Sequence, residues 1–384
     1  MRQRRRLAAS MVPVWFVLSI IMVAAGSCAA PSARQRASPS AASQARLKVI
    51  SIPLRGEVDD LAAGGGYVWA FVRDTGVLVR IAQRTGKVQR FALGAWRRMP
   101  VVDAATQGAV WLANQHSTHP DLIRVSAATG RIVARPPVPG RSGPIWGLTA
   151  AYGSVWILAP DAASPPGWRV LRLNPATNRV DKISANIAGT QFTGHTASIW
   201  ADAGKIWVTG SQDTIVSLNP RTMAMHTTPT AGLSEGLAFG GGDAWQLAND
   251  RPGLSMIDPR TGRAIKTFTV PPPSATGDDQ AVVGIGLLWV FRGSDLTVLS
   301  RSSGQAVGSS RVQPLAGSFG TAALVIGRTL WYLAQAPNGT SIDRVDVSAA
   351  RAVASWAGSS SLSPLALRDC TGFGNRTRTI SLGI

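Results

Sequence analysis

Acidic residues at one recurring position of the sequence could bind a metal ion. Asp59, Glu235 and Asp279 each stand ten residues before a tryptophan, and Asp278 adjoins Asp279. Carboxylate oxygens are ligands that Ca²⁺ and Mg²⁺ prefer, so a cluster of these acids would suit either ion. Their spacing matches no defined ligand motif. We therefore favour solvated loop ends or strand caps as their role, with a Ca²⁺ or Mg²⁺ site as the alternative.

Aromatic and basic residues in the predicted loops could bind an organic ligand. An exposed aromatic ring beside a guanidinium group suits a sugar or an anionic ligand. The candidates are Trp96, Arg97, Arg98, Trp146, Trp168 and His195. Packing of the loops on one another would account for the same residues equally well.

Residues that could carry out catalysis are scarce. His116 and His119 stand three apart in "HSTHP", but a zinc site needs at least three protein ligands and no third is near in sequence. The chain has no CxxC pair and no G-x-S-x-G motif. We therefore assign no catalytic residue.

A repeated unit must position these side chains. Tryptophans follow a Gly-x-apolar lead at spacings of 38 to 51 residues, each within a short apolar run. They are Trp69, Trp111, Trp156, Trp207, Trp245, Trp289 and Trp331. A period of about 44 residues that holds four short strands is typical of a β-propeller blade. The sequence therefore predicts an all-β, seven-bladed β-propeller over residues 47–361, with four-stranded antiparallel blades and the tryptophans packed between them.

The turn that follows the third strand of each unit is also repeated, as in "IDPRTGR". One aligned position needs a positive φ to close the hairpin, which favours Gly or Asn. It holds Gly86, Gly130, Asn178, Met223, Gly262, Gly304 and Ala350. A second aligned position holds Pro175, Pro220 and Pro259, where a fixed φ is useful.

The ends of the repeat indicate how the ring closes. Residues 47–56, "LKVISIPLRG", look like a fourth strand without the three strands before it. We expect this segment to pair with the last blade, and "RAVASWAG" (residues 351–358) is an alternative fourth strand. Residues 362–384 match no repeat and are treated as a tail.

Residues 1–27 have the order of an export signal: "MRQRRR", an apolar run, and then "AGSC". The motif around Cys28 resembles the lipobox of bacterial lipoproteins, in which the cysteine is lipidated and becomes the first mature residue. An uncleaved membrane anchor is the alternative, since about 19 apolar residues just span a bilayer. Both place the later chain outside the cytoplasm, attached to the bacterial cell membrane. Residues 28–46 are small, polar and proline-rich, which predicts a flexible tether.

The net charge of +19 is compatible with a nucleic-acid partner, but other features argue against one. Four of the arginines lie in the export signal, and the others are spread through the chain. Export also separates the protein from nucleic acid. Weak attraction to anionic surface polymers or lipid head groups is the expected consequence of the charge.

The repeat "G-x-hydrophobic-Trp … Ile-Asp-Pro-x-Thr-Gly" resembles the propellers of the virginiamycin B lyase type and the related YVTN and quinoprotein-like repeat families. The resemblance implies the fold. The lyases place a Glu after the aromatic pair of the second strand, with a His and Glu cluster and a divalent metal. Here the residues three after each Trp are Val72, Asn114, Ala159, Gly210, Ala248, Arg292 and Ala334. No lyase catalytic residue is carried over.

Three functions follow as expectations. The first is a non-catalytic, membrane-anchored, extracytoplasmic propeller that binds a protein, glycan or small ligand through its loops. The second is a metal-dependent enzyme of the lyase or lactonase type, with Asp59, Glu235 and Asp279 holding the ion. The third is a structural or assembly role at the cell envelope.

Overall fold

The computed structural model describes residues 48–93, 101–114, 122–141, 143–161, 167–187, 198–233, 237–247, 252–272, 279–315, 322–336 and 339–346. Every regular element in these ranges is a β-strand. They contain no helix with the length and apolar character that crossing a membrane requires. The predicted signal, Cys28, the tether, the alternative strand at residues 351–358 and the tail lie outside the described residues.

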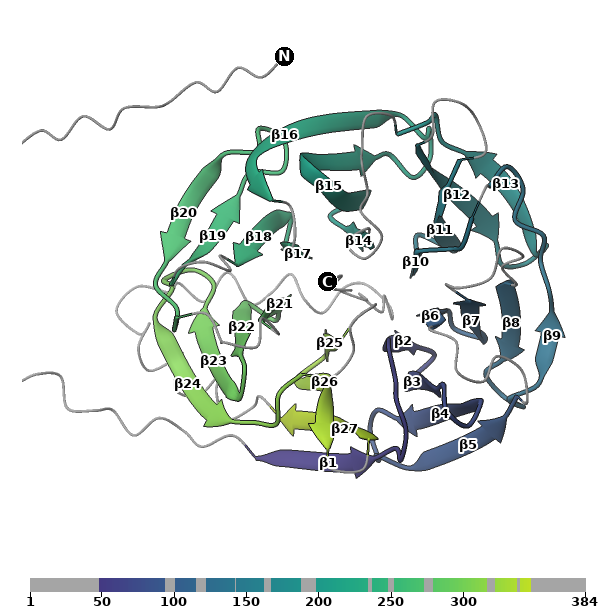
Figure 1. Ribbon diagram of the computed structural model, residues 1–384, viewed down its shortest axis with the longest axis horizontal. Helices are drawn as coiled ribbons and strands as arrows, with labels where there is room; N and C mark the ends of the chain where they lie inside the picture. The colour runs from purple at the N-terminus through teal and green to yellow at the C-terminus, as the bar shows by residue number, and fades with distance from the viewer. Residues whose placement is uncertain are drawn as a thin grey trace, which may run out of the picture. The chain divides into compact units, whose positions relative to one another are not determined.

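The strands form seven antiparallel sheets arranged in a ring (Figure 1). From the inside outwards, blade one contains β2 (Ala62–Gly64), β3 (Tyr67–Val72), β4 (Val77–Ala82) and β5 (Val88–Ala92). Blade two contains β6 (Val101–Ala105), β7 (Ala109–Asn114), β8 (Leu122–Ser126) and β9 (Ile132–Ala134). Blade three contains β10 (Gly147–Ala151), β11 (Ser154–Pro160), β12 (Trp168–Asn174) and β13 (Arg179–Ile183).

Blade four contains β14 (Ser198–Asp202), β15 (Lys205–Leu218) and β16 (Met225–Leu233). Blade five contains β17 (Leu237–Gly240), β18 (Asp243–Leu247), β19 (Leu254–Ile257) and β20 (Ala264–Phe268). Blade six contains β21 (Gln280–Gly284), β22 (Leu287–Arg292), β23 (Asp295–Ser300) and β24 (Ala306–Arg311). The last blade contains β25 (Ala323–Ile326), β26 (Thr329–Ala336), β27 (Gly339–Asp346) and β1 (Val49–Pro53).

The prediction of a seven-bladed β-propeller is confirmed. In blade four the continuous element β15 takes the places of both the second and the third strand. Its first residues pair with β14 and its last residues pair with β16.

The ring closes between the first described strand and the last blade. β1 pairs antiparallel with β27, so the predicted role of residues 47–56 as the fourth strand of the last blade is confirmed. All strands of the ring therefore lie between Val49 and Asp346, within the compact unit Ser43–Ile384.

The antiparallel order gives the propeller two different faces. The turns between the first and second strands and the hairpins between the third and fourth strands lie at one face, here named the turn face. The loops between the second and third strands and the connections between blades lie at the other, the loop face. Val49 pairs with Val345 and Pro53 pairs with Ser341, so β1 begins at the turn face and ends at the loop face.

The repeated tryptophans form the core between the blades, as predicted. All seven are buried, with at most 2% of their surface exposed. Their ring N–H groups bond to the turn five residues earlier in three blades: Trp69 to Gly64 O (3.5 Å), Trp156 to Ala151 O (3.0 Å) and Trp207 to Asp202 O (3.2 Å). This packing occupies the rings, so they belong to the scaffold that holds the loops.

The hairpins of the turn face repeat one backbone conformation. In the six described hairpins the aligned residue has a φ between 56° and 73°, which confirms the prediction and extends it to Met223. Its N–H bonds to the carbonyl four residues earlier at 2.8 to 2.9 Å in each case. At Gly304 a Cβ would overlap the ring of Phe268 in the preceding blade, so glycine is required there for packing as well as for φ.

The aligned prolines have a second role, because their carbonyls accept hydrogen bonds from the preceding blade. A fixed φ helps to hold each carbonyl in place. The bonds run from Arg124 to Pro175 (2.8 Å), from Arg172 to Pro220 (3.3 Å) and from Thr228 to Pro259 (3.1 Å).

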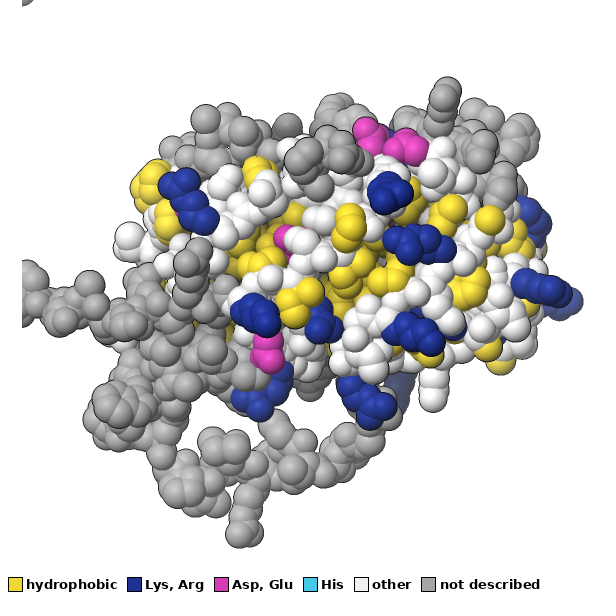
Figure 2. Space-filling model, turned by 90° about the horizontal axis from the view of Figure 1, so that it is seen from below, with side chains coloured by type: hydrophobic (Ala, Val, Ile, Leu, Met, Phe, Trp, Pro, Cys, Tyr) yellow, Lys and Arg dark blue, Asp and Glu magenta, His cyan; other side chains and the backbone are white. Residues whose placement is uncertain are grey.

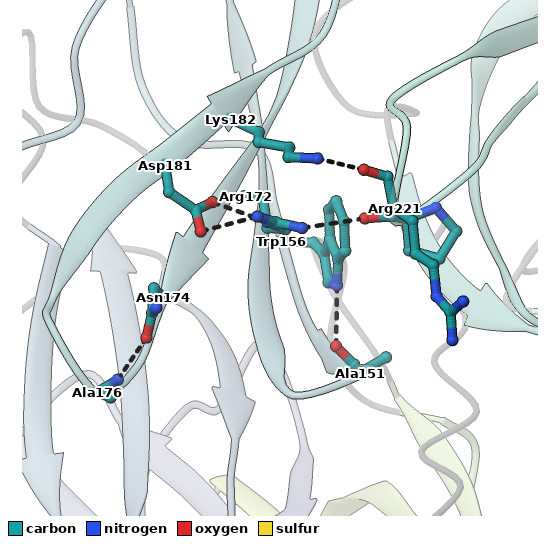
Figure 3. Close-up of polar contacts among 9 residues, drawn as sticks. Ala151, Trp156, Arg172, Asn174, Ala176, Asp181, Lys182 and Arg221 are labelled. Atoms are coloured by element: carbon teal, nitrogen blue, oxygen red, sulfur yellow. Dashed lines mark hydrogen bonds and ion pairs between the residues drawn. The ribbon is translucent and has the colours of Figure 1, made fainter.

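Figure 3 shows one of these links between blades three and four. The Arg172 guanidinium donates two hydrogen bonds to Asp181 of its own blade, at 2.7 and 2.8 Å, and a third to the next blade's hairpin. The bonds from Arg172 lower the pKa of Asp181. Lys182 donates to the carbonyl of Arg221 beside it. Such links keep neighbouring blades in register and thereby fix the loops above them.

Candidate functional site

The loop face is the candidate binding face, because loops on a rigid scaffold commonly carry the residues that contact ligands. Asp59, Asp279, Trp146 and Trp168 are described. Asp59 belongs to blade one, the two tryptophans to blade three and Asp279 to blade six. The other predicted residues lie outside the described ranges: Trp96, Arg97, Arg98, His116, His119, His195, Glu235 and Asp278.

Asp59 lies in the segment that leads from β1 to β2 and faces an arginine. Its side chain is 6% exposed, and its Oδ1 is 3.3 Å from Nη1 of Arg73, the residue after β3. The same guanidinium forms an ion pair with Glu57. The backbone also joins the two segments, since Arg73 N–H donates to Glu57 O at 2.9 Å and Glu57 N–H donates to Asp74 Oδ2 at 2.8 Å. Arg73 therefore offsets part of the negative charge of Glu57 and Asp59 in blade one.

Asp279 precedes β21 and forms a buried ion pair. Its Oδ2 is 2.5 Å from Nη1 of Arg292, the last residue of β22. Only 3% of the Asp279 side chain and 2% of the Arg292 side chain are exposed. Charges removed from water to this degree need a close opposite charge to remain ionised. The pair therefore fixes the connection into blade six against the end of its second strand.

The two rim acids share one arrangement: each faces an arginine at the end of the second strand of its own blade. Sequence reasoning missed both arginines, although the sequence contained a usable signal for one. Gly284 pairs with Leu287 across the turn, and counting outwards in that antiparallel register places Asp279 opposite Arg292.

The placement of the described acidic side chains can be compared with the predicted metal site. Within the described ranges, no group of three His, Cys, Asp or Glu side chains is placed to hold a metal ion. The predicted Ca²⁺ or Mg²⁺ site stays a prediction, since Glu235 and Asp278 lie outside those ranges.

Trp146 and Trp168 contact each other at the loop end of blade three. Their ring centroids are 6.0 Å apart, with an interplanar angle of 65°, which is an edge-to-face contact. Trp168 is 8% exposed and belongs to the core cluster between blades three and four, and Trp146 is half-buried against that cluster. The two rings pack on each other, and a ligand contact for Trp146 or Trp168 stays a prediction.

A further ion pair beside these rings was not found from the sequence. Arg169 Nε is 2.7 Å from Asp161 Oδ2, and the Asp161 side chain is 3% exposed while that of Arg169 is 30% exposed. Arg169 and Arg73, which is 24% exposed, thus present guanidinium groups that a carboxylate orients and water still reaches. A guanidinium held in this way suits recognition of a carboxylate or phosphate group.

Comparison with known proteins agrees with this architecture. No protein-family model and no curated protein matches the chain. Virginiamycin B lyase from Staphylococcus aureus matches in structure with a TM-score of 0.57 and 16% identity, over 78% of this chain and 99% of that chain. A streptogramin B lyase structure gives 0.56 and 13%, over 78% and 97%. U3-55K gives 0.59 and 10%, over 78% and 98%. At these identities the likeness shows the propeller fold, which confirms the fold that the repeat resemblance implied.

Proposed function

We propose that this chain is an extracytoplasmic, membrane-anchored β-propeller that binds a protein, glycan or small ligand through its loop face without catalysing a reaction. The observation that carries the proposal is the pairing of Asp59 with Arg73 and of Asp279 with Arg292. In a metal-dependent propeller enzyme the rim acids would coordinate a cation. In this chain both described acids face a guanidinium group.

The partly exposed side chains of Arg73 and Arg169 support a ligand that carries an anionic group. The order of residues 1–28 supports export and attachment to the membrane. The alternative is a metal-dependent enzyme of the lyase or lactonase type. Its support is the propeller fold that this chain shares with virginiamycin B lyase, together with the acids Asp59, Glu235 and Asp279.

A thermal melt with and without metals separates the two functions. We expect the melting temperature of the chain beginning at Ser43 to be the same with Ca²⁺, Mg²⁺ or Zn²⁺ as with a chelator. A metal bound at 100 times its dissociation constant would add about 2.7 kcal/mol to the free energy of unfolding. A rise in melting temperature that disappears in Glu235→Gln would contradict the proposal and favour the enzyme.

The anchor is tested with the full chain in a bacterial host. We expect the protein in the membrane fraction and labelled by a radioactive fatty acid, with the label lost in Cys28→Ser. Membrane location without label in the unchanged chain would indicate the uncleaved anchor instead. Recovery in the cytosol would contradict export altogether.

A further inference from the structure

The turn face is where the N-terminal segment joins the propeller. β1 runs from the turn face to the loop face, because Val49 pairs with Val345 at the end of β27 and Pro53 pairs with Ser341 near its start. Any tether that precedes residue 48 is therefore attached at the turn face. Attachment to a membrane through this tether would therefore act on the propeller from its turn face.

The turn face carries an excess of exposed positive charge. Six exposed cations stand in the hairpins of blades one, two, four and five: Arg84, Lys87, Arg131, Arg221, Arg260 and Arg263. Within the six hairpins that the structure describes, the acidic residue is Asp258. Its Oδ1 accepts the backbone N–H of Arg260 at 2.8 Å and lies 3.5 Å from Nε of the same arginine, so Asp258 offsets one of the six cations. Figure 2 views the propeller edge-on and shows that Lys and Arg side chains also predominate over Asp and Glu on that outer edge.

Few other acids lie at the same face, and of these Asp346, at the end of β27, is exposed. Asp202 is buried and accepts the Gly242 N–H at 2.8 Å, and Asp243 is half-buried. Tyr152, in the turn of blade three, is 46% exposed. A tyrosine with an apolar ring and a polar hydroxyl is suited to the boundary between lipid and water.

We propose that the turn face lies on an anionic phospholipid surface and leaves the loop face open to partners. This inference rests on the proposed membrane attachment, which supplies the proximity. Its own support is charge complementarity, because basic residues held near an anionic bilayer strengthen binding roughly fivefold each. The cations are distributed around the ring over four blades, which matches a broad planar surface better than the single stripe that a nucleic-acid duplex would follow.

The experiment measures binding to phospholipid vesicles. The chain beginning at Ser43 keeps every strand of the ring, so it isolates the face from the anchor. We expect it to sediment with vesicles that contain phosphatidylglycerol, to bind less as salt is raised, and not to sediment with pure phosphatidylcholine vesicles. A turn-face variant should bind at least about 20-fold more weakly, since several contributions of roughly fivefold are removed. It carries Arg84→Gln, Lys87→Gln, Arg260→Gln and Arg263→Gln.

A matched control removes the same charge from the outer edge and the loop end of the ring. It carries Arg55→Gln, Arg90→Gln, Arg135→Gln and Arg311→Gln, all exposed positions, and should lose less than about threefold in affinity. Circular dichroism melts establish that both variants are folded.

Three outcomes would overturn the inference. They are no binding to anionic vesicles, equal losses in the two variants, and tighter binding to duplex DNA than to the vesicles at the same salt. Fractionation of the full chain tests the anchor separately. If the proposed membrane attachment is wrong, the full chain is recovered in the cytosol. If the proposed lipid binding by the turn face is wrong, the vesicle experiment shows it.

Discussion

Replacing Arg292 with methionine should lower the free energy of unfolding by about 3–5 kcal/mol. The change removes the buried positive charge 2.5 Å from Asp279, while methionine keeps much of the side-chain volume. Burial of the Asp279 carboxylate without this cation then costs stability. Urea denaturation of the single variant measures the loss.

Two further variants test this interpretation. In the double variant Asp279→Leu with Arg292→Met most of the loss should be recovered, because replacing a buried ion pair with apolar residues is often neutral or stabilising. The matched control is Arg311→Met in the same blade. Arg311 pairs with Asp295 at 3.4 Å, but their side chains are 87% and 57% exposed, so the cost should stay within about 1 kcal/mol. A single variant as stable as this control would show that the buried pair does not hold the rim of blade six.

Replacing Asp343 with alanine should cost about 3–5 kcal/mol and should loosen the closure of the ring. Asp343 is 2% exposed and lies in β27, between β26 and β1. Its carboxylate accepts hydrogen bonds from Ser51 (2.5 Å), Ser341 (2.8 Å) and Tyr332 (3.2 Å). Burial, followed by the charge of Asp343, raises the pKa of Tyr332, so its phenol stays protonated and keeps donating. The variant leaves these hydroxyl groups without their shared acceptor.

Hydrogen exchange separates closure from general instability. We expect Asp343→Ala to accelerate amide exchange more in β1 than in β11 of blade three, relative to the unchanged chain. The reason is that Ser51 bonds the first strand to the last blade. A matched control is Ser255→Ala, which removes an exposed cross-strand bond of 3.2 Å to Thr267 between the outer strands of blade five. It should change stability by less than about 0.5 kcal/mol. Uniform acceleration over all blades would contradict a specific role in closure.

The proposals give the two faces different tasks. The loop face presents Arg73 and Arg169 to a partner, and the turn face carries the cations that would meet lipid. The links between blades, such as Arg172 to Pro220, hold both faces in one rigid ring. Binding by such a scaffold needs little reorganisation of the chain, because the propeller is already formed.

The sequence by itself determined the blade number, the hairpin conformation and the closing strand. These features follow from patterns along the chain, since the repeat of about 44 residues sets the blade number and a hairpin requires a positive φ at a fixed position. The hairpin role of Gly262 and the packing role of the tryptophans can therefore be predicted without knowledge of the rest of the fold. The hairpin at Met223 shows the limit of this reasoning, because its positive φ follows from the repeated turn and not from the residue type.

Only the tertiary structure decided which charges meet. Asp279 and Arg292 face each other across a strand pair, and Ser51 and Asp343 stand 292 residues apart in the chain. Acids and arginines have no sequence period that identifies their partners, because an ion pair depends on register, burial and the distance between two side chains. Sequence reasoning therefore interpreted Asp59 and Asp279 as loop-end or metal-binding acids, whereas the fold places a guanidinium group beside each of them.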